Sequence, residues 1–262
     1  METIVVILEI IGAVAFAASG ALVGIKKNMD LFGVCVLGLS TAVDGGVIRD
    51  IILGQCPPAM FTNPIYAIAG LFTCIFTFVP EVRAFIDHKE NIMLLADGIG
   101  LGIFTASGTV HALNTADANM FLAVFVGVVT GVGGGLLRDV MAEVPPYIFT
   151  KHIYALASMI GGTLLCVIYP FFGKYFAMFI SAGTIVVIRI LASRFRWNIP
   201  RAEQLQRMHR TSGKILERKW FILALLRMLG WRILQGFQSL FHFLKKRCFH
   251  RLLREYPTDS LL

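Results

Sequence analysis

The chain has 262 residues, of which 56% are hydrophobic and only 15% are charged, and its mean hydropathy is +0.74. A soluble domain has about 25% charged residues, so this composition excludes an ordinary soluble protein and predicts an integral membrane protein. The formal net charge is +8, but residues 1–193 hold nine Lys and Arg against twelve Asp and Glu, whereas residues 194–262 hold fifteen against four. The excess positive charge therefore belongs to a C-terminal tail.

Seven segments are long and apolar enough to cross a membrane, because a spanning helix needs about 20 mostly apolar residues. They lie at about 4–24, 31–53, 63–80, 92–110, 119–141, 152–170 and 175–193. Short connections with turn residues separate them, including Pro57-Pro58 and Pro145-Pro146, and leave no room for a soluble domain. The sequence predicts an all-α domain of seven transmembrane helices over residues 1–197, followed by a tail over 198–262.

The short connections also predict the orientation of the spans, because cytoplasmic loops carry an excess of Lys and Arg. Every second connection is basic, and the basic residues are Lys26, Lys27, Arg83, Lys89, Lys151 and those of the tail. The connections between these contain only one basic residue, Lys174. This alternation places the N-terminus outside and the C-terminus in the cytoplasm. The first apolar run ends in a Lys pair instead of a cleavage site, which favours a retained helix.

Two stretches of the chain recur about 88 residues further on. Residues 16–20 (FAASG) return as 104–108 (FTASG), and residues 44–50 (DGGVIRD) return as 133–139 (GGGLLRD). The two units, at about 4–80 and 92–170, each hold three spans, so the second must enter the membrane from the opposite side. Inverted repeats of this kind are typical of transporters and channels, and the seventh helix stands outside them.

The glycines in the recurring motif have two interpretations. Small residues let membrane helices pack closely, whereas a break in a helix would free carbonyl groups to line a pathway. Because the glycines occur twice and each time precede an Arg-Asp pair, we expect a break or hinge at Gly45, Gly46, Gly133, Gly134 and Gly135.

The arginines of the motif need partners, because a charge inside a membrane is costly unless it is paired or reaches the interface. An interface anchor is one interpretation of Arg49 and Arg138. The other is pairing with carboxylates at the same depth on the preceding helices, which predicts the ion pairs Glu9–Arg49 and Asp97–Arg138. Adjacent residues of a helix point in different directions, so we expect Asp50 and Asp139 to face water.

Three further polar residues lie in the spans. Asp44 replaces the first glycine of the second copy, and it is either a cation site in a wet pathway or a paired structural residue. Ser19 and Ser107 recur, and either line the pore or bond back to their own helices. His88, His111 and His152 lie at the ends of spans without ligand spacing, so we expect solvated side chains, no metal site and no cofactor.

The tail becomes apolar again between about residues 220 and 244. Its polar side chains gather on one side of a helical projection, which predicts an amphipathic helix on anionic lipid headgroups. An eighth span is the alternative, and nucleic-acid binding is not expected. These polar residues are Arg227, Arg232, Gln235, Gln238, Ser239 and His242.

The doubled Gly-Gly-x-x-Arg-Asp motif, with two three-helix repeats and a seventh helix, resembles the prokaryotic trimeric intracellular cation (TRIC) channels over about residues 5–197. The resemblance implies a homotrimer in which each subunit has its own pore, lined by kinked second and fifth helices and permeable to K⁺ and Na⁺. The same broad family contains bacterial members described as glycine transporters. Asp44 and the long tail depart from the family pattern.

We therefore expect a multi-pass protein of the bacterial cytoplasmic (inner) membrane that is a monovalent cation channel. In that hypothesis Arg49 and Arg138 guard the two mouths and repel multivalent cations. The alternative is a secondary transporter for a small amino acid such as glycine, whose carboxylate the arginines would bind. A structural scaffold fits the repeated ionisable residues poorly, and the sequence has no nucleophile–base or phosphate-loop pattern of an enzyme.

Overall fold

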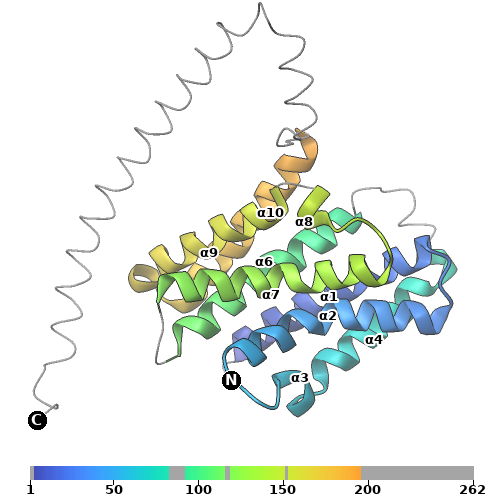
Figure 1. The fold of residues 1–262 in the computed structure, drawn as a ribbon, viewed down its shortest axis with the longest axis horizontal. Coiled ribbons are helices and arrows are strands. Elements are labelled where there is room, and N and C mark those ends of the chain that lie inside the picture. Colours follow the sequence, from blue (N-terminus) through green and yellow to red (C-terminus); the bar gives the residue numbers. More distant parts are fainter. Residues whose placement is uncertain (1–2, 83–91, 116–118, 151–152, 196–262) are drawn as a thin grey trace, which may run out of the picture. The chain divides into compact units, whose positions relative to one another are not determined.

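The computed structural model describes residues 3–82, 92–115, 119–150 and 153–195, and the regular elements in these ranges are all α-helices (Figure 1). The predicted basic tail, with its interfacial helix or eighth span, lies outside the described residues. The helices are α1 (Thr3–Lys26), α2 (Leu31–Ile52), α3 (Ala59–Thr62), α4 (Ile65–Phe78), α6 (Ile92–Leu113), α7 (Met120–Met141), α8 (Tyr147–Thr150), α9 (Ile153–Phe172) and α10 (Lys174–Arg194).

Six of the described helices are long and apolar enough to cross a membrane: α1, α2, α6, α7, α9 and α10. The third predicted span is shorter than expected, because α4 has 14 residues and is therefore about 21 Å long. Prolines explain the difference. Pro64 stands immediately before α4 and Pro80 lies two residues after its last residue, and proline cannot continue the hydrogen-bonding pattern of a helix interior.

The two helices that carry the recurring motif begin in the same way. Asp30 caps α2 by accepting a hydrogen bond from the backbone N–H of Gly33 at 2.7 Å. Asn119 caps α7 by accepting one from Leu122 at 2.8 Å. A side-chain oxygen at this position satisfies an amide that has no partner within the helix. The two caps set α2 and α7 in the same register, so their Arg-Asp pairs fall at equivalent positions.

Helices α2 and α7 pack against each other at the centre of the described unit. Around them, α1 packs on α2, α4 and α6, while α6 packs on α7, α9 and α10. Figure 1 shows α7 crossing the middle of this unit, with α9 and α10 on one side and α2 and α4 on the other. The motif residues therefore lie in the interior.

The predicted break at the glycines is wrong for this structure. Both α2 and α7 are continuous α-helices through Gly45-Gly46 and Gly133–Gly135. A methyl group at Gly45 would overlap the carbonyl oxygen of Thr130, and one at Gly134 would overlap that of Thr41. The glycines thus serve close packing, because only a residue without a side chain lets the two backbones approach this far.

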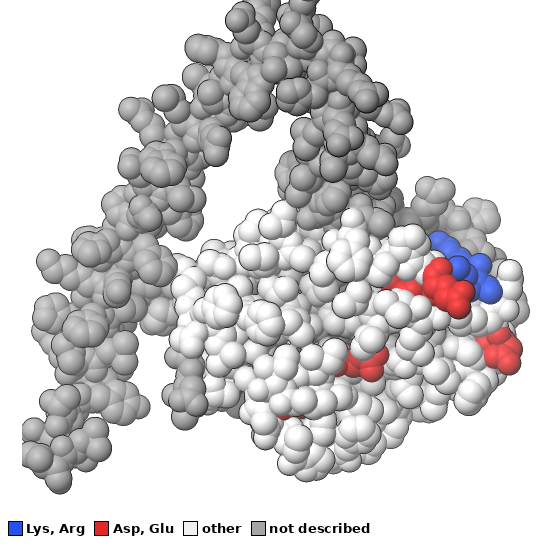
Figure 2. Space-filling view, viewed as in Figure 1, with Lys and Arg blue, Asp and Glu red and all other residues white. Residues whose placement is uncertain are grey.

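The outward surface of the described helices is almost free of charge. Figure 2 shows a largely white face with a few acidic and basic side chains, most of them near one edge. Large apolar side chains are exposed, among them Phe72, Phe76, Phe121 and Phe179. A soluble protein rarely exposes so much contiguous apolar surface, so this surface fits contact with lipid.

Candidate functional site

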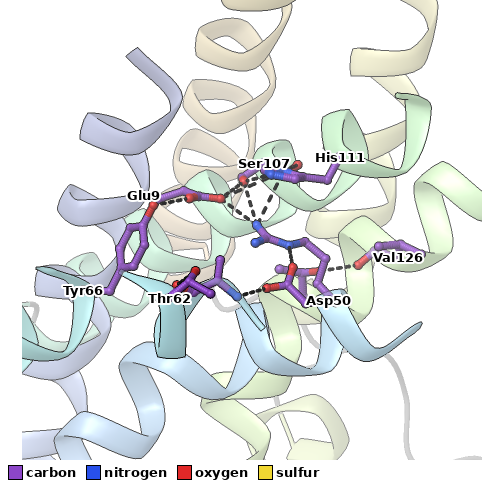
Figure 3. A network of polar contacts seen from close by, with 10 residues as sticks. Glu9, Asp50, Thr62, Tyr66, Ser107, His111 and Val126 are labelled. Carbon is purple, nitrogen blue, oxygen red and sulfur yellow. Dashed lines mark hydrogen bonds and ion pairs between the residues drawn. The ribbon is translucent and has the colours of Figure 1, made fainter. Parts of the chain in front are cut away.

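Arg49 contacts Glu9, Asp50 and Ser107 in a buried polar cluster, which we call cluster 1. Figure 3 labels these three partners. Nη1 of Arg49 lies 2.6 Å from Oε1 of Glu9, and Nε of Arg49 donates to Oδ1 of Asp50 at 2.7 Å. The same Nη1 donates to the hydroxyl of Ser107 at 3.2 Å. The side chains of Arg49 and Glu9 are each only 4% exposed, so these contacts replace the water that the charges lose on burial.

Glu9 has further partners on α6 and α4. The hydroxyl of Ser107 donates to Oε1 of Glu9, and the hydroxyl of Tyr66 on α4 donates to Oε2 at 3.0 Å. Nδ1 of His111 lies 4.0 Å from Oε1 of Glu9 and 3.5 Å from Nη1 of Arg49. Cluster 1 thus joins α1, α2, α4 and α6, and both carboxylate oxygens of Glu9 are engaged.

Arg138 forms an equivalent cluster, which we call cluster 2. Its Nη1 lies 2.8 Å from Oδ1 of Asp97 and 2.5 Å from the hydroxyl of Ser19. Its Nε donates to Oδ1 of Asp139 at 2.8 Å. Asp97 and Arg138 are fully buried and Asp139 is 1% exposed. Because these groups are shielded from water, each charge of cluster 2 is stabilised by its oppositely charged neighbours.

Cluster 2 contains a second arginine, which comes from α10. Nη2 of Arg189 lies 3.2 Å from Oδ2 of Asp97. Its guanidinium carbon lies 4.6 Å from the ring centre of Tyr154, a favourable position for a cation–π contact. The seventh predicted helix is therefore tied electrostatically to the second repeat.

The two ion pairs predicted from the sequence are present, and the serines connect them. Ser19 lies on the helix that carries Glu9, yet its hydroxyl contacts Arg138 of the second repeat. Ser107 lies on the helix that carries Asp97, yet it contacts Arg49 of the first. Each serine therefore forms a hydrogen bond with the arginine of the other repeat. The sequence predicts either pore lining or a bond to the serine's own helix, and neither includes this contact.

The expectation that Asp50 and Asp139 face water is wrong, because each is 1% exposed. Although neighbouring residues diverge on a helix, the long arginine side chain folds back so that its Nε reaches the adjacent carboxylate. The other oxygen of Asp50 accepts a hydrogen bond from the backbone N–H of Ala59 at 2.8 Å. Asp139 accepts one in the same way from Tyr147, also at 2.8 Å. Each aspartate thus anchors the short helix that follows the proline pair.

The sequence interpretation missed several members of the clusters. His111 was expected to be a solvated helix end, but its side chain is only 19% exposed and lies against Glu9. Tyr66 and Tyr154 occupy equivalent positions in the two repeats, a spacing that could have marked them as partners of the carboxylates. Arg189 carried the clearest missed signal, because a single arginine in an apolar span needs a buried partner.

A pocket, rather than a break, lies beside the first copy of the motif. It encloses about 330 Å³ of unfilled space, including its open mouth. Asp44 lies between two residues of α2 that line this pocket; its side chain is half-buried, and none of the described residues forms a hydrogen bond or ion pair with it. The pocket is lined by cluster 1 and its neighbours, namely Glu9, Ala42, Val43, Gly46, Arg49, Asp50, Ala59, Met60, Tyr66 and Phe104.

The hydrogen bond between Arg138 and Ser19 joins the two repeats, and its contribution to stability can be measured. We expect Ser19→Ala to lower the free energy of unfolding by about 1.5–3 kcal/mol, because a hydrogen bond to a buried charged group is lost. Thermal unfolding of the full chain in detergent would measure this effect. Ser193→Ala, at an exposed position of α10, is the matched control, and equal stability of the two variants would contradict the assigned role of Ser19.

The fold and the two clusters define a class of protein: helical multi-pass membrane proteins with two units, each built around an arginine held between two carboxylates. The family model described as "Glycine transporter" matches the chain twice, over residues 6–81 and 94–170. The chain therefore belongs to this family. The two matched segments coincide with the two units recognised in the sequence.

Relatives in several bacteria share the sequence. The UPF0126 inner membrane protein YadS of Escherichia coli K12 is 38% identical over 192 residues, covering 73% of this chain and 92% of the relative. The UPF0126 membrane protein YvgT of Bacillus subtilis is 31% identical over 194 residues, covering 74% and 94%. This chain is therefore similar to bacterial membrane proteins across most of their length.

Solved structures of TRIC channels share the fold. A TRIC cation channel is 39% identical with a TM-score of 0.67, and the match covers 74% of this chain and 95% of that one. A prokaryotic TRIC channel is 31% identical with a TM-score of 0.70, covering 76% and 100%. The TRIC trimeric intracellular cation channel orthologue from Rhodobacter sphaeroides is 30% identical with a TM-score of 0.67, covering 75% and 100%. The resemblance to TRIC channels noted in the sequence is confirmed.

Proposed function

We propose that the chain is a channel for the monovalent cations K⁺ and Na⁺ that acts as a homotrimer with a pathway through each subunit. The observation that carries this proposal is the similarity to TRIC cation channels over at least 95% of the length of those chains, at 30–39% identity. The proposed pathway runs beside the central helices α2 and α7.

The order of the clusters along the helices supports an inverted arrangement of the two repeats. Helix α1 meets cluster 1 at Glu9 and cluster 2 at Ser19, whereas α6 meets cluster 2 at Asp97 and cluster 1 at Ser107. Ten residues separate the two contacts on each helix, which is about 15 Å at 1.5 Å per residue. The clusters would thus lie at two different depths of one pathway.

The formal charges favour a cation in the pocket. Cluster 1 contains Arg49, Glu9 and Asp50, so its net charge is −1 while His111 is neutral. The pocket is bordered by these charges, and Asp44 adds a further carboxylate on the same helix. This balance does not support the hypothesis that the arginines repel multivalent cations at the mouths, because each arginine is already matched by carboxylates.

Transport of a small amino acid such as glycine is the second candidate, and two observations favour it. The family model that matches the chain is described as a glycine transporter, and Arg49 lines the pocket. However, Glu9 and Asp50 already occupy Nη1 and Nε of Arg49. The carboxylate of glycine would have to use the remaining donors or displace one of these groups, which makes this the weaker candidate.

Reconstitution of the full chain in liposomes separates the two functions. We expect K⁺ efflux that does not saturate with ion concentration, and no accumulation of labelled glycine. Protein-free liposomes set the background leak. Saturable glycine uptake into vesicles that hold their K⁺ gradient would overturn the channel and support the transporter.

The cellular setting completes the proposal. We place the protein in the bacterial cytoplasmic membrane, as supported by the inner membrane relative in Escherichia coli. The Lys and Arg alternation of the connections supports an N-terminus outside and a C-terminus in the cytoplasm. The basic tail would then lie on anionic lipid headgroups.

A further inference from the structure

The two clusters are alike in geometry but unequal in charge. Cluster 1 holds one arginine and two carboxylates. Cluster 2 holds two arginines, Arg138 and Arg189, with the two carboxylates Asp97 and Asp139, so its formal charge is zero. Among the described residues that contact Glu9, the only basic side chains are Arg49 and His111. The difference of one unit charge is therefore the contribution of Arg189.

Arg189 is placed by the packing of α10. Its Cβ lies above Gly98 of α6, where a methyl group on the glycine would be 3.6 Å away, so α10 approaches α6 closely at this point. The guanidinium group lies over the ring of Tyr154, and its Nη2 contacts Oδ2 of Asp97. The side chain is only 4% exposed. Arg189 is thus a buried member of cluster 2 and not a solvated basic residue at the end of a helix.

We infer that Arg189 makes the two ends of the pathway electrostatically unequal, so that each channel passes more cation current in one direction than in the other. The inference rests on the proposed cation channel. The clusters are about 15 Å apart along α1 and α6, so a cation near one end experiences mainly the nearer cluster. A net charge of −1 concentrates cations at the end near cluster 1, and the neutral cluster 2 does not.

The size of the effect follows from electrostatics. A unit charge about 10 Å away in water changes the local concentration of a monovalent cation about two-fold. Salt screens this effect, and the Debye length is about 30 Å in 0.01 M salt and about 3 Å in 1 M salt. We therefore expect a ratio of currents at opposite voltages of about 1.6 in 0.01 M KCl and close to one in 1 M KCl.

Single-channel recordings of the full chain in planar bilayers test the inference, because each channel shows its own asymmetry whichever way it has inserted. Identical KCl solutions on both sides, at pH 8, keep a histidine of ordinary pKa near 6.5 neutral. We expect Arg189→Leu to move the current ratio in 0.01 M KCl from about 1.6 toward one, because cluster 2 then also carries −1. Arg189→Lys retains the charge and is expected to retain the ratio.

Two more variants separate charge from structure. Arg194→Gln removes a positive charge from the exposed end of the same helix, and the current ratio should stay at the wild-type value. Glu9→Gln removes the net charge of cluster 1 and should also move the ratio toward one, which provides a second test should Arg189→Leu not fold.

The outcomes are distinguishable. Wild-type channels that conduct K⁺ with equal currents at both voltages would overturn the inference and leave the proposed function standing. Asymmetric currents that persist unchanged in Arg189→Leu or in Glu9→Gln would also overturn it. The complete absence of K⁺ current in the wild-type protein would instead refute the proposed function, and the inference with it.

Discussion

Replacing Arg138 with alanine is expected to cost about 3–5 kcal/mol of unfolding free energy, because it leaves a buried carboxylate without its cation. Asp97 retains Arg189 as a partner at 3.2 Å, so the unpaired charge is that of Asp139. Thermal unfolding of the full chain in detergent, together with the yield of monodisperse protein, would measure the loss. A large loss would show that cluster 2 holds the two repeats together.

Three comparisons make this prediction specific. Asp139→Asn in the Arg138→Ala background should recover part of the lost stability, because it removes the unpaired charge. Arg49→Ala should cost less than Arg138→Ala, since the pocket that borders cluster 1 gives water a route into the space that the arginine side chain leaves. Arg194→Ala, at an exposed site, should change stability by less than about 0.5 kcal/mol. The reverse order of the two buried arginines would contradict the difference between the clusters.

The ion pairs could be predicted from the sequence because depth and repetition act together as constraints. A buried arginine requires a carboxylate at its own depth, and the repeat offset reduced the choice to Glu9 and Asp97. The role of Asp50 could not be predicted in this way. Whether an arginine folds back onto its neighbour depends on the surroundings of its long side chain, here the short helix α3 that the same aspartate anchors.

The number of spans shows a similar limit. Composition predicted seven spans, and six of the described helices are long and apolar enough to cross a membrane. The length of the third helix is limited by Pro64 and Pro80, whose effect composition does not register. The addition of Arg189 to cluster 2 depends on the packing of α10 against α6, which is a tertiary contact without a counterpart in the repeat. Sequence reasoning thus found the two symmetric ion pairs, Glu9–Arg49 and Asp97–Arg138, and missed the asymmetric contact of Arg189.

The glycines were misread because a helix break and a close helix crossing use the same residue. Both need a position without a side chain, one to release the backbone and the other to bring two backbones together. Only the neighbours separate the cases. At Gly45 the neighbour is the backbone of Thr130, whereas at Gly46 no atom of another helix in the described part of the chain lies within 4 Å of the position that a methyl group would occupy.

Alanine is therefore expected to destabilise the protein at Gly45 but not at Gly46. Gly45→Ala should lower the free energy of unfolding by at least about 1–3 kcal/mol, because its methyl group meets a backbone carbonyl that cannot rotate away. Gly134→Ala should behave in the same way through Thr41. Gly46→Ala should be neutral or raise stability by up to about 1 kcal/mol, because alanine favours a helix more than glycine does.

Thermal unfolding of the three variants in detergent is the measurement, and Gly46→Ala is the matched control for Gly45→Ala because it makes the same chemical change one residue away. If the glycines instead served as a flexible hinge, alanine would stiffen the helix at either position, and the two neighbours would respond alike. Equal stability changes at 45 and 46 would thus contradict the close crossing of α2 and α7. A loss of stability at 45 without one at 46 would establish the close crossing of α2 and α7, and any opening of the proposed pathway beside it would have to preserve the crossing.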